Sequence, residues 1–222
     1  AFYLLSREVA KHCKVVQSGQ GADELFAGYH WYPQVDGAKD AFAAYRAAFF
    51  DREHDEYAAC VQPAWLTGDM AGEFVREHFA MPGADAAVDK ALRLDSTVML
   101  VDDPVKRVDN MTMAWGLEAR TPFLDYRVAE LSARIPAQFK LPEGGKYVLK
   151  EAARKVIPSE VIDRPKGYFP VPGLKHLEGA TLGWVRDLLL DPSQDRGLFN
   201  PAMLDQLLTN PQGQLTPLRG SK

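Results

Sequence analysis

Apolar residues recur along the chain at the spacing of an amphipathic helix, and this pattern starts at the first residues. Phe2, Leu5 and Val9 would share one face, so the pattern predicts a helix over Phe2–Lys11. The same criterion predicts a helix over residues 38–50 and a second one that runs through Ala59 and ends at Pro63. Further helices are predicted over residues 70–80, 84–100, 102–115, 125–135, 146–156, 182–190 and 201–208. The chain is therefore predicted to be mainly helical.

One short segment breaks the helical pattern. Residues Lys14–Gln17 include two adjacent valines, which favours a buried strand of a parallel sheet. The strand ends in the glycine turn Ser18–Gly21, and Asp23 and Glu24 then open another helix. Ligands of open α/β sheets bind at the carboxyl ends of strands, where backbone N–H groups face an anion. The predicted fold class is thus α/β, although an ordinary capped helix also explains the turn.

Proline and glycine set the expected boundaries. Asp102-Asp103-Pro104 is typical of a helix start, with an acid at the N-cap and proline at the first helical position. Pro122 predicts a loop over Leu117–Asp125. The aromatic stretch Gly28–Gly37 either shapes an acceptor pocket or covers a core, and core cover is favoured. No shift in composition marks a boundary, so residues 1–222 are interpreted as one domain.

Composition narrows the classes of function. The chain has 222 residues, of which 46% are hydrophobic and 25% charged, as in a globular protein. Its net charge of −4 argues against a non-specific nucleic-acid surface. No apolar run is long enough to span a bilayer and no signal peptide is visible, so no membrane partner is expected. Cys13 and Cys60 lack metal or disulfide spacing, which fits small apolar side chains in a reducing cytoplasm.

Four ordered segments resemble the synthetase domain of glutamine-dependent asparagine synthetases and their relatives, which include β-lactam synthetase. They are Ser18–Tyr29, the acidic Val101–Pro104 with Arg107–Met111, Leu117–Asp125, and Lys146–Arg154 with Arg164–Phe169. Within the family, Gln17–Asp23 and Gly28–Pro33 most resemble the N-acetylglutaminylglutamine amidotransferase branch. The resemblance implies an adenine nucleotide alpha hydrolase-like fold, of the PP-loop ATP pyrophosphatase type.

The same resemblance implies ATP and Mg²⁺ as cofactors. It assigns nucleotide contacts to Ser18, Gly19 and Gly21, and a hydroxyl and an unhindered N–H suit that task. It assigns Mg²⁺ to Asp23, because a hard cation prefers a carboxylate oxygen. The alternative is that Asp23 and Glu24 only favour the helix dipole.

Three residues are candidates for the chemical step. By resemblance, Lys166 serves the formation of the intermediate, as a point charge that follows the phosphate. Gln20 replaces the glutamate usual in asparagine synthetases and cannot act as a general base, so we expect it to position the acceptor. Asp103 is the candidate partner acid, with helix capping as an equal alternative. Gln20 makes a larger acceptor, such as a peptide carboxylate, more credible than aspartate.

The third segment also carries the strongest family signature. Its charged residues alternate beside an apolar Pro-Phe-Leu sequence, which predicts a buried network of ion pairs that fixes a loop. The residues of this predicted network are Glu118, Arg120, Asp125 and Arg127.

Together these features predict ATP-dependent amide synthesis, in which a carboxylate is adenylated and glutamine-derived ammonia then attacks. The resemblance implies that pyrophosphate binds to an upstream Ser-Gly-Gly-x-Asp-Ser loop and that an N-terminal cysteine hydrolyses glutamine, and neither is in this sequence. We therefore expect a C-terminal piece of a longer enzyme, inactive by itself, with a glutaminase domain on the same full-length chain. Whether the protein forms a homo-oligomer stays open. The alternatives are asparagine synthesis from aspartate and a non-catalytic helical interaction module.

Overall fold

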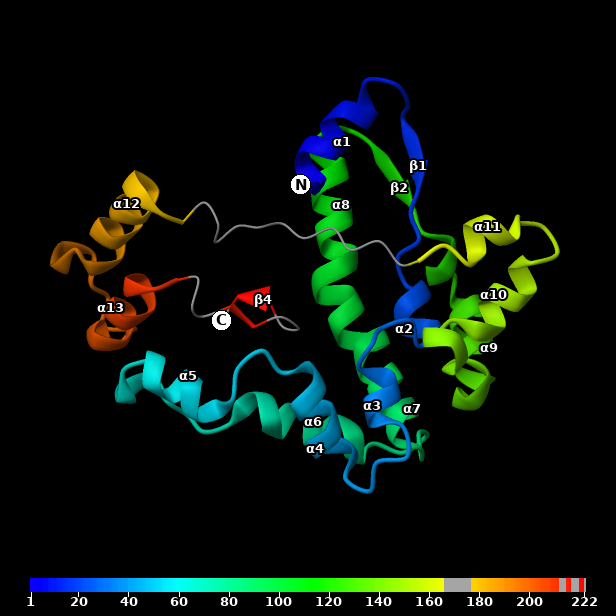
Figure 1. Ribbon diagram of the computed structural model, residues 1–222, viewed down its shortest axis with the longest axis horizontal. Coiled ribbons are helices and arrows are strands. Elements are labelled where there is room, and N and C mark those ends of the chain that lie inside the picture. The colour runs from blue at the N-terminus through cyan, green and yellow to red at the C-terminus, as the bar shows by residue number, and fades with distance from the viewer. Residues whose placement is uncertain (166–176, 212–214, 217–219, 222) are drawn as a thin grey trace. The chain divides into compact units, whose positions relative to one another are not determined.

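The computed structural model describes residues 1–165, 177–211, 215–216 and 220–221 (Figure 1). The chain forms two compact units. The first holds residues 1–48 and 75–165, and the second holds residues 49–74 and the described residues from 177 onward. Both units are built mainly from helices, as the sequence pattern predicts.

The helices and strands follow one another as α1 (Phe2–Ala10), β1 (Val15–Gln17), α2 (Ala22–Phe26), α3 (Tyr32–Val35), α4 (Ala41–Phe49), α5 (His54–Cys60), η1 (Pro63–Trp65), α6 (Met70–Ala80), α7 (Ala87–Leu94), η2 (Asp95–Met99), η3 (Val101–Val105), α8 (Lys106–Met113), β2 (Glu118–Arg120), η4 (Pro122–Leu124), α9 (Tyr126–Arg134), η5 (Ala137–Phe139), η6 (Pro142–Gly144), α10 (Tyr147–Ala153), α11 (Ser159–Ile162), α12 (Gly179–Leu190), η8 (Pro192–Gln194), α13 (Pro201–Thr209), β3 (Leu215–Thr216) and β4 (Gly220–Ser221).

A small parallel sheet lies in the first unit, where β1 pairs with β2 and Val15 stands opposite Glu118. The predicted strand at residues 14–17 is confirmed, but β2 forms where the sequence predicts a loop. The predicted burial of the strand is wrong, because Val15 is 44% exposed. Parallel strands are buried on both faces only where helices cover both. Here Val16 and Ala119 are half-buried, and their neighbours on the opposite face are exposed within the described residues.

A continuous helical run joins α7 to α8 through two π-helical turns, η2 and η3. Figure 1 shows the α8 end of this run lying beside α1, which packs on it. Pro104 is buried inside η3, so the predicted helix start at Asp102-Asp103-Pro104 is wrong. The wider turn changes the hydrogen-bond pattern locally and accommodates a residue that has no N–H.

The core of the first unit forms where α3 packs on α7. Tyr32 and Val35 of α3 are fully buried, and so is Val88 of α7. The ring of Tyr45 packs edge-on against Phe79, with ring centroids 5.4 Å apart. The aromatic stretch therefore covers a core, as the sequence favours.

The second unit contains a packed pair of helices. α12 packs on α13, where the Arg186 guanidinium contacts the Asp205 carboxylate at 2.5 Å. The indole N–H of Trp65 donates to the Gly197 carbonyl at 2.7 Å, so η1 is tied to the segment that precedes α13. Among the described residues, no helix has both the length and the apolar character needed to cross a membrane.

Candidate functional site

The turn that follows β1 leaves the backbone of Gly19 exposed. The N–H of Ser18 donates to the Arg120 carbonyl at 2.8 Å, which extends the β1–β2 ladder into the turn. The Ser18 amide is therefore already bonded, so its predicted nucleotide contact would fall to the hydroxyl. Gly19 is exposed, and a Cβ added there would meet nothing within 4 Å. This geometry is compatible with a ligand close to the Gly19 backbone, and the nucleotide contact itself stays a prediction.

The conformation and packing of the turn explain why residue 21 is a glycine. Its φ is +94°, a conformation that residues with a Cβ rarely adopt. An added Cβ would lie 2.4 Å from the Cδ2 atom of Leu124, so η4 packs directly against the turn. Gly21 therefore fixes the shape of the turn, whatever its predicted nucleotide contact adds.

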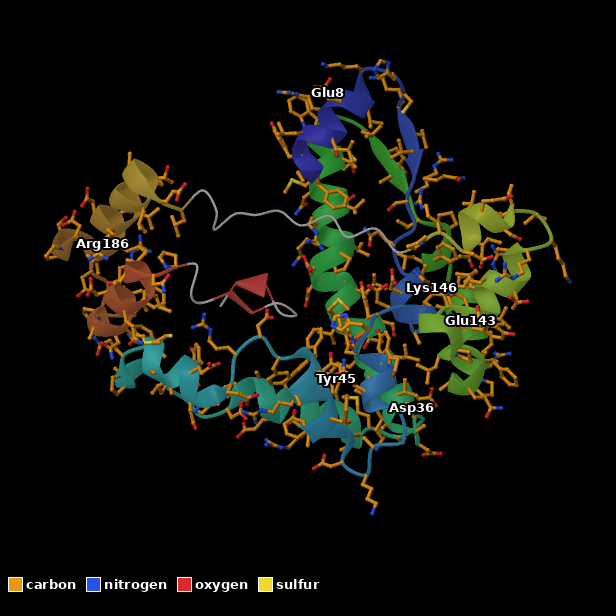
Figure 2. The ribbon with its side chains drawn as sticks, in the orientation of Figure 1. Glu8, Asp36, Tyr45, Glu143, Lys146 and Arg186 are labelled. Carbon is orange, nitrogen blue, oxygen red and sulfur yellow. The ribbon has the colours of Figure 1, made fainter. Side chains whose placement is uncertain are left out.

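Asp23 lies beside the turn and meets a lysine from a distant segment. The Lys146 ammonium contacts its carboxylate at 3.0 Å, and the two side chains are 27% and 25% exposed. Figure 2 shows Lys146 beside α2. Glu24 is buried instead and accepts a 2.6 Å hydrogen bond from the Tyr29 hydroxyl. Burial raises the pKa of Tyr29 well above its usual value, so this hydroxyl stays a donor. Both acids thus have specific partners, and they also lie in the first turn of α2, so the dipole alternative stays open.

Asp23 suits one ligand position of a magnesium ion. The described residues contain no group of three or more His, Cys, Asp or Glu side chains placed to hold a metal. Mg²⁺ is commonly held by one or two carboxylates together with phosphate oxygens and water. A partly exposed carboxylate fits that pattern, in which the nucleotide completes the coordination. Metal binding at Asp23 stays a prediction.

The candidates for the chemical step lie on different elements. Asp103 is exposed on η3 and pairs with Arg107 one helical turn later, at 3.1 Å, so the helix-capping alternative is wrong. Gln20 is half-buried in the turn. The functional pairing of Gln20 with Asp103 stays a prediction. Lys166 lies outside the described residues, so its role in the chemical step stays a prediction.

The predicted buried ion-pair network is wrong. Arg120 and Glu118 are 4.0 Å apart, with side chains 68% and 57% exposed. They lie two residues apart on β2 and so share its exposed face. Arg127 contacts Asp125 at 2.8 Å and is 75% exposed. This arginine holds the pKa of Asp125 at about 2, and the Asp125 carboxylate also caps α9. Both pairs are local and do not cross-link a loop.

A buried carboxylate that sequence reasoning missed lies in η2. Asp95 is fully buried and accepts hydrogen bonds from the indole of Trp31 at 3.1 Å, from the hydroxyl of Tyr32 at 2.7 Å and from the hydroxyl of Tyr45. Burial raises its pKa to about 6, against the effect of these donors. The available signal was an acid inside an apolar helical pattern, but its aromatic partners lie 50 or more positions away.

The described residues define a helix-rich α/β protein with a small parallel sheet and a glycine turn at the end of β1. The family model of asparagine synthase matches residues 1–220. The chain belongs to the asparagine synthase family.

Named relatives agree with this family. The chain is 26% identical to glutamine-hydrolysing asparagine synthetase 1 of Bacillus subtilis, over 92% of the chain and 38% of the relative. It is 33% identical to the glutamine-hydrolysing asparagine synthetase of Gallus gallus, over 90% of the chain and 29% of the relative. It is 27% identical to glutamine-hydrolysing asparagine synthetase B of Escherichia coli, over 84% of the chain and 24% of the relative. The chain therefore spans between 24% and 38% of the length of these relatives.

Proposed function

We propose that the complete protein is an ATP-dependent amide synthetase that takes ammonia from glutamine. The family match over residues 1–220 is the observation that carries this proposal, and the names of the relatives agree with it. In the first step, an oxygen of the substrate carboxylate bonds to the α-phosphorus of ATP and pyrophosphate leaves. In the second step, ammonia attacks the acyl carbon, AMP leaves, and a proton passes to solvent, which gives the amide.

The glycine turn supports a nucleotide site at the end of β1. In this proposal the Ser18 hydroxyl and the backbone of Gly19 and Gly21 contact the nucleotide, and Asp23 provides one oxygen to Mg²⁺. When bound, the ion neutralises phosphate charge. Lys166 would stabilise the negative charge that builds up on the leaving pyrophosphate.

The fold and the partners of the complete protein belong to the same proposal. Both units would form the C-terminal part of one synthetase domain of the PP-loop ATP pyrophosphatase type. A glutaminase domain on the same chain would supply ammonia, and the protein would work in the cytoplasm. The small parallel sheet and the helical majority are compatible with that fold class.

The acceptor we propose is N-acetylglutaminylglutamine. The supporting residue is Gln20, which stands where asparagine synthetases usually carry glutamate and cannot remove a proton at neutral pH. An amide at this position favours an acceptor held by hydrogen bonds, and Asp103 is the proposed partner acid. Asparagine synthesis from aspartate is the second candidate, because the relatives are named asparagine synthetases. Amide formation by the purified complete protein, with each acceptor in turn, distinguishes the two.

The main test substitutes Lys166. We expect the complete Lys166→Ala protein to lose glutamine- and acceptor-dependent pyrophosphate release while glutamine hydrolysis continues, because only the adenylation step needs the extra positive charge. Lys39→Ala is the control, since Lys39 is exposed and lies far from this loop in the sequence. Unchanged pyrophosphate release in Lys166→Ala would refute the role of Lys166. Failure of the wild-type complete protein to bind Mg²⁺-ATP in calorimetry would instead favour a non-catalytic helical module.

A further inference from the structure

Lys146 contacts α2 from a position 123 residues later in the chain. Its ammonium lies 3.0 Å from the Asp23 carboxylate, and each side chain keeps about a quarter of its surface exposed. A pair with this exposure is partly shielded from water, and a ligand can still reach it. The sequence pattern assigns no role to this lysine.

Backbone contacts hold Lys146 at this place. Its N–H donates to the Phe26 carbonyl at 2.8 Å. The preceding Gly145 passes so close to α2 that an added Cβ would lie 2.0 Å from the Ala27 carbonyl oxygen. Lys146 itself has a φ of 59°, in the left-handed region. Because the segment is docked by its backbone, the ammonium can change partners while the backbone stays in place.

The Asp23 carboxylate is confined on another side by Gly28. A Cβ added at Gly28 would lie 2.2 Å from the Oδ1 atom of Asp23, the same oxygen that contacts Lys146. A cation that binds this oxygen therefore competes with the ammonium. The two positive charges also repel each other at this distance.

We propose that Lys146 is a positioning residue that competes with the metal for Asp23. In the nucleotide-free protein its ammonium neutralises the carboxylate, and it transfers to a phosphate oxygen when the magnesium–nucleotide complex binds. Lysine suits this exchange, because it carries a compact charge on a flexible stem. This inference rests on the proposed function, since it needs a nucleotide at the glycine turn.

The first experiment compares Lys146→Gln with wild type in the complete protein. Without nucleotide, we expect Mn²⁺, used as a probe for Mg²⁺ in electron paramagnetic resonance, to bind about threefold tighter, as expected from removal of a competing exposed charge. With Mg²⁺ and α,β-methylene ATP, whose α–β bridge resists cleavage, calorimetry should show binding weakened about tenfold by loss of a charge-assisted hydrogen bond. Unchanged or weaker Mn²⁺ binding overturns the proposal, and so does nucleotide binding that is unchanged or tighter.

Lys150→Gln is the matched control, because Lys150 lies in α10, the helix whose N-cap residue is Lys146, and donates to the Glu143 carbonyl within its own segment. We expect both affinities to equal those of wild type. Changes in Lys150→Gln as large as those in Lys146→Gln would point to general charge and would overturn a specific role for Lys146.

A second variant keeps the proposal testable if Lys146→Gln does not fold. Asp23→Asn releases the ammonium from its partner, so in EDTA we expect metal-free α,β-methylene ATP to bind about threefold tighter than to wild type. Loss of the carboxylate charge alone also favours a polyanion, so the proposal further requires that this gain be smaller when Asp23→Asn is made together with Lys146→Gln than when it is made alone. Equal or weaker binding to Asp23→Asn, or the same gain with and without Lys146, would overturn the proposal. If wild type itself binds no nucleotide, the proposed function fails together with this inference. If wild type binds and the variants do not differ from it, only the inference fails.

Discussion

The environment of Asp95 departs from what its neighbours in the sequence indicate. Its carboxylate is fully buried, and its hydrogen-bond donors Trp31, Tyr32 and Tyr45 come from the residue before α3, from α3 and from α4. A buried polar group of this kind is costly to leave unpaired, so its partners must be held in place. Asp95 therefore ties the aromatic stretch to the π-helical turn η2.

Asp95 should make the stability of the protein depend on pH. Its pKa rises from 3.8 to about 6 because of burial. Between these values the unfolded chain has lost a proton that the folded chain still binds, so stability falls as pH rises towards 6 and then levels off. From pH 4.5 to 7.5 we expect the contribution of Asp95 to the unfolding free energy to fall by about 2 kcal/mol.

Denaturant unfolding of the complete protein, followed by tryptophan fluorescence, measures this effect as the difference between wild type and Asp95→Asn at the two pH values. Glu130→Gln on the exposed side of α9 serves as the control and should keep the wild-type profile. An identical pH dependence in Asp95→Asn and wild type would show that Asp95 does not titrate in this range.

At the scale of elements, the decisive contacts join segments that are distant in the chain. The end of α2 is closed by the backbone that leads into α10, through the bond from Lys146 to the Phe26 carbonyl. The run from α7 to α8 passes through Pro104 without stopping. A hydrogen bond from a distant segment thus closes the end of α2, and the capping signal at Asp102-Asp103-Pro104 does not mark a helix start.

Gly145 tests the docking of α10 on α2. Its φ is +94°, and an added Cβ would lie 2.0 Å from the Ala27 carbonyl oxygen, so Gly145→Ala is both strained and overpacked. We expect a loss of about 2 kcal/mol or more of unfolding free energy. Gly144→Ala is a matched control, because Gly144 also has a positive φ but an added Cβ meets nothing within 4 Å. The control should lose about 1 kcal/mol.

Thermal and denaturant unfolding of the two glycine variants measure the difference between them. Equal losses for Gly145→Ala and Gly144→Ala would mean that strain alone matters, and that the close approach to Ala27 contributes nothing. A smaller loss for Gly145→Ala would contradict the docking described for α10.

At the scale of the whole molecule, the chain forms two compact units and spans only part of the length of its relatives. The proposed reaction needs a phosphate-binding loop and a source of ammonia, and the 222 residues contain neither the Ser-Gly-Gly-x-Asp-Ser sequence nor an N-terminal cysteine. The proposed activity is therefore one to test on the complete protein.

We expect the isolated 222-residue chain to release no pyrophosphate from ATP, with or without glutamine, because it lacks the loop that binds the leaving group. The complete protein should do so when acceptor and glutamine are present. A coupled pyrophosphate assay on both proteins checks this. Turnover by the isolated chain at a rate similar to that of the complete protein would contradict the assignment of the upstream loop.

The sequence by itself determined the helical majority, the strand before the glycine turn and the family. Those features depend on local periodicity, on β-branched residues and on ordered motifs, all of which can be read along the chain. Tertiary structure alone decided that β2 pairs with β1, that Asp95 meets its aromatic partners, and that Lys146 contacts Asp23. It also left Glu118 and Arg120 exposed where burial was predicted. These contacts join residues far apart in sequence, and their free energy comes from burial and hydrogen bonds that form only when the segments meet.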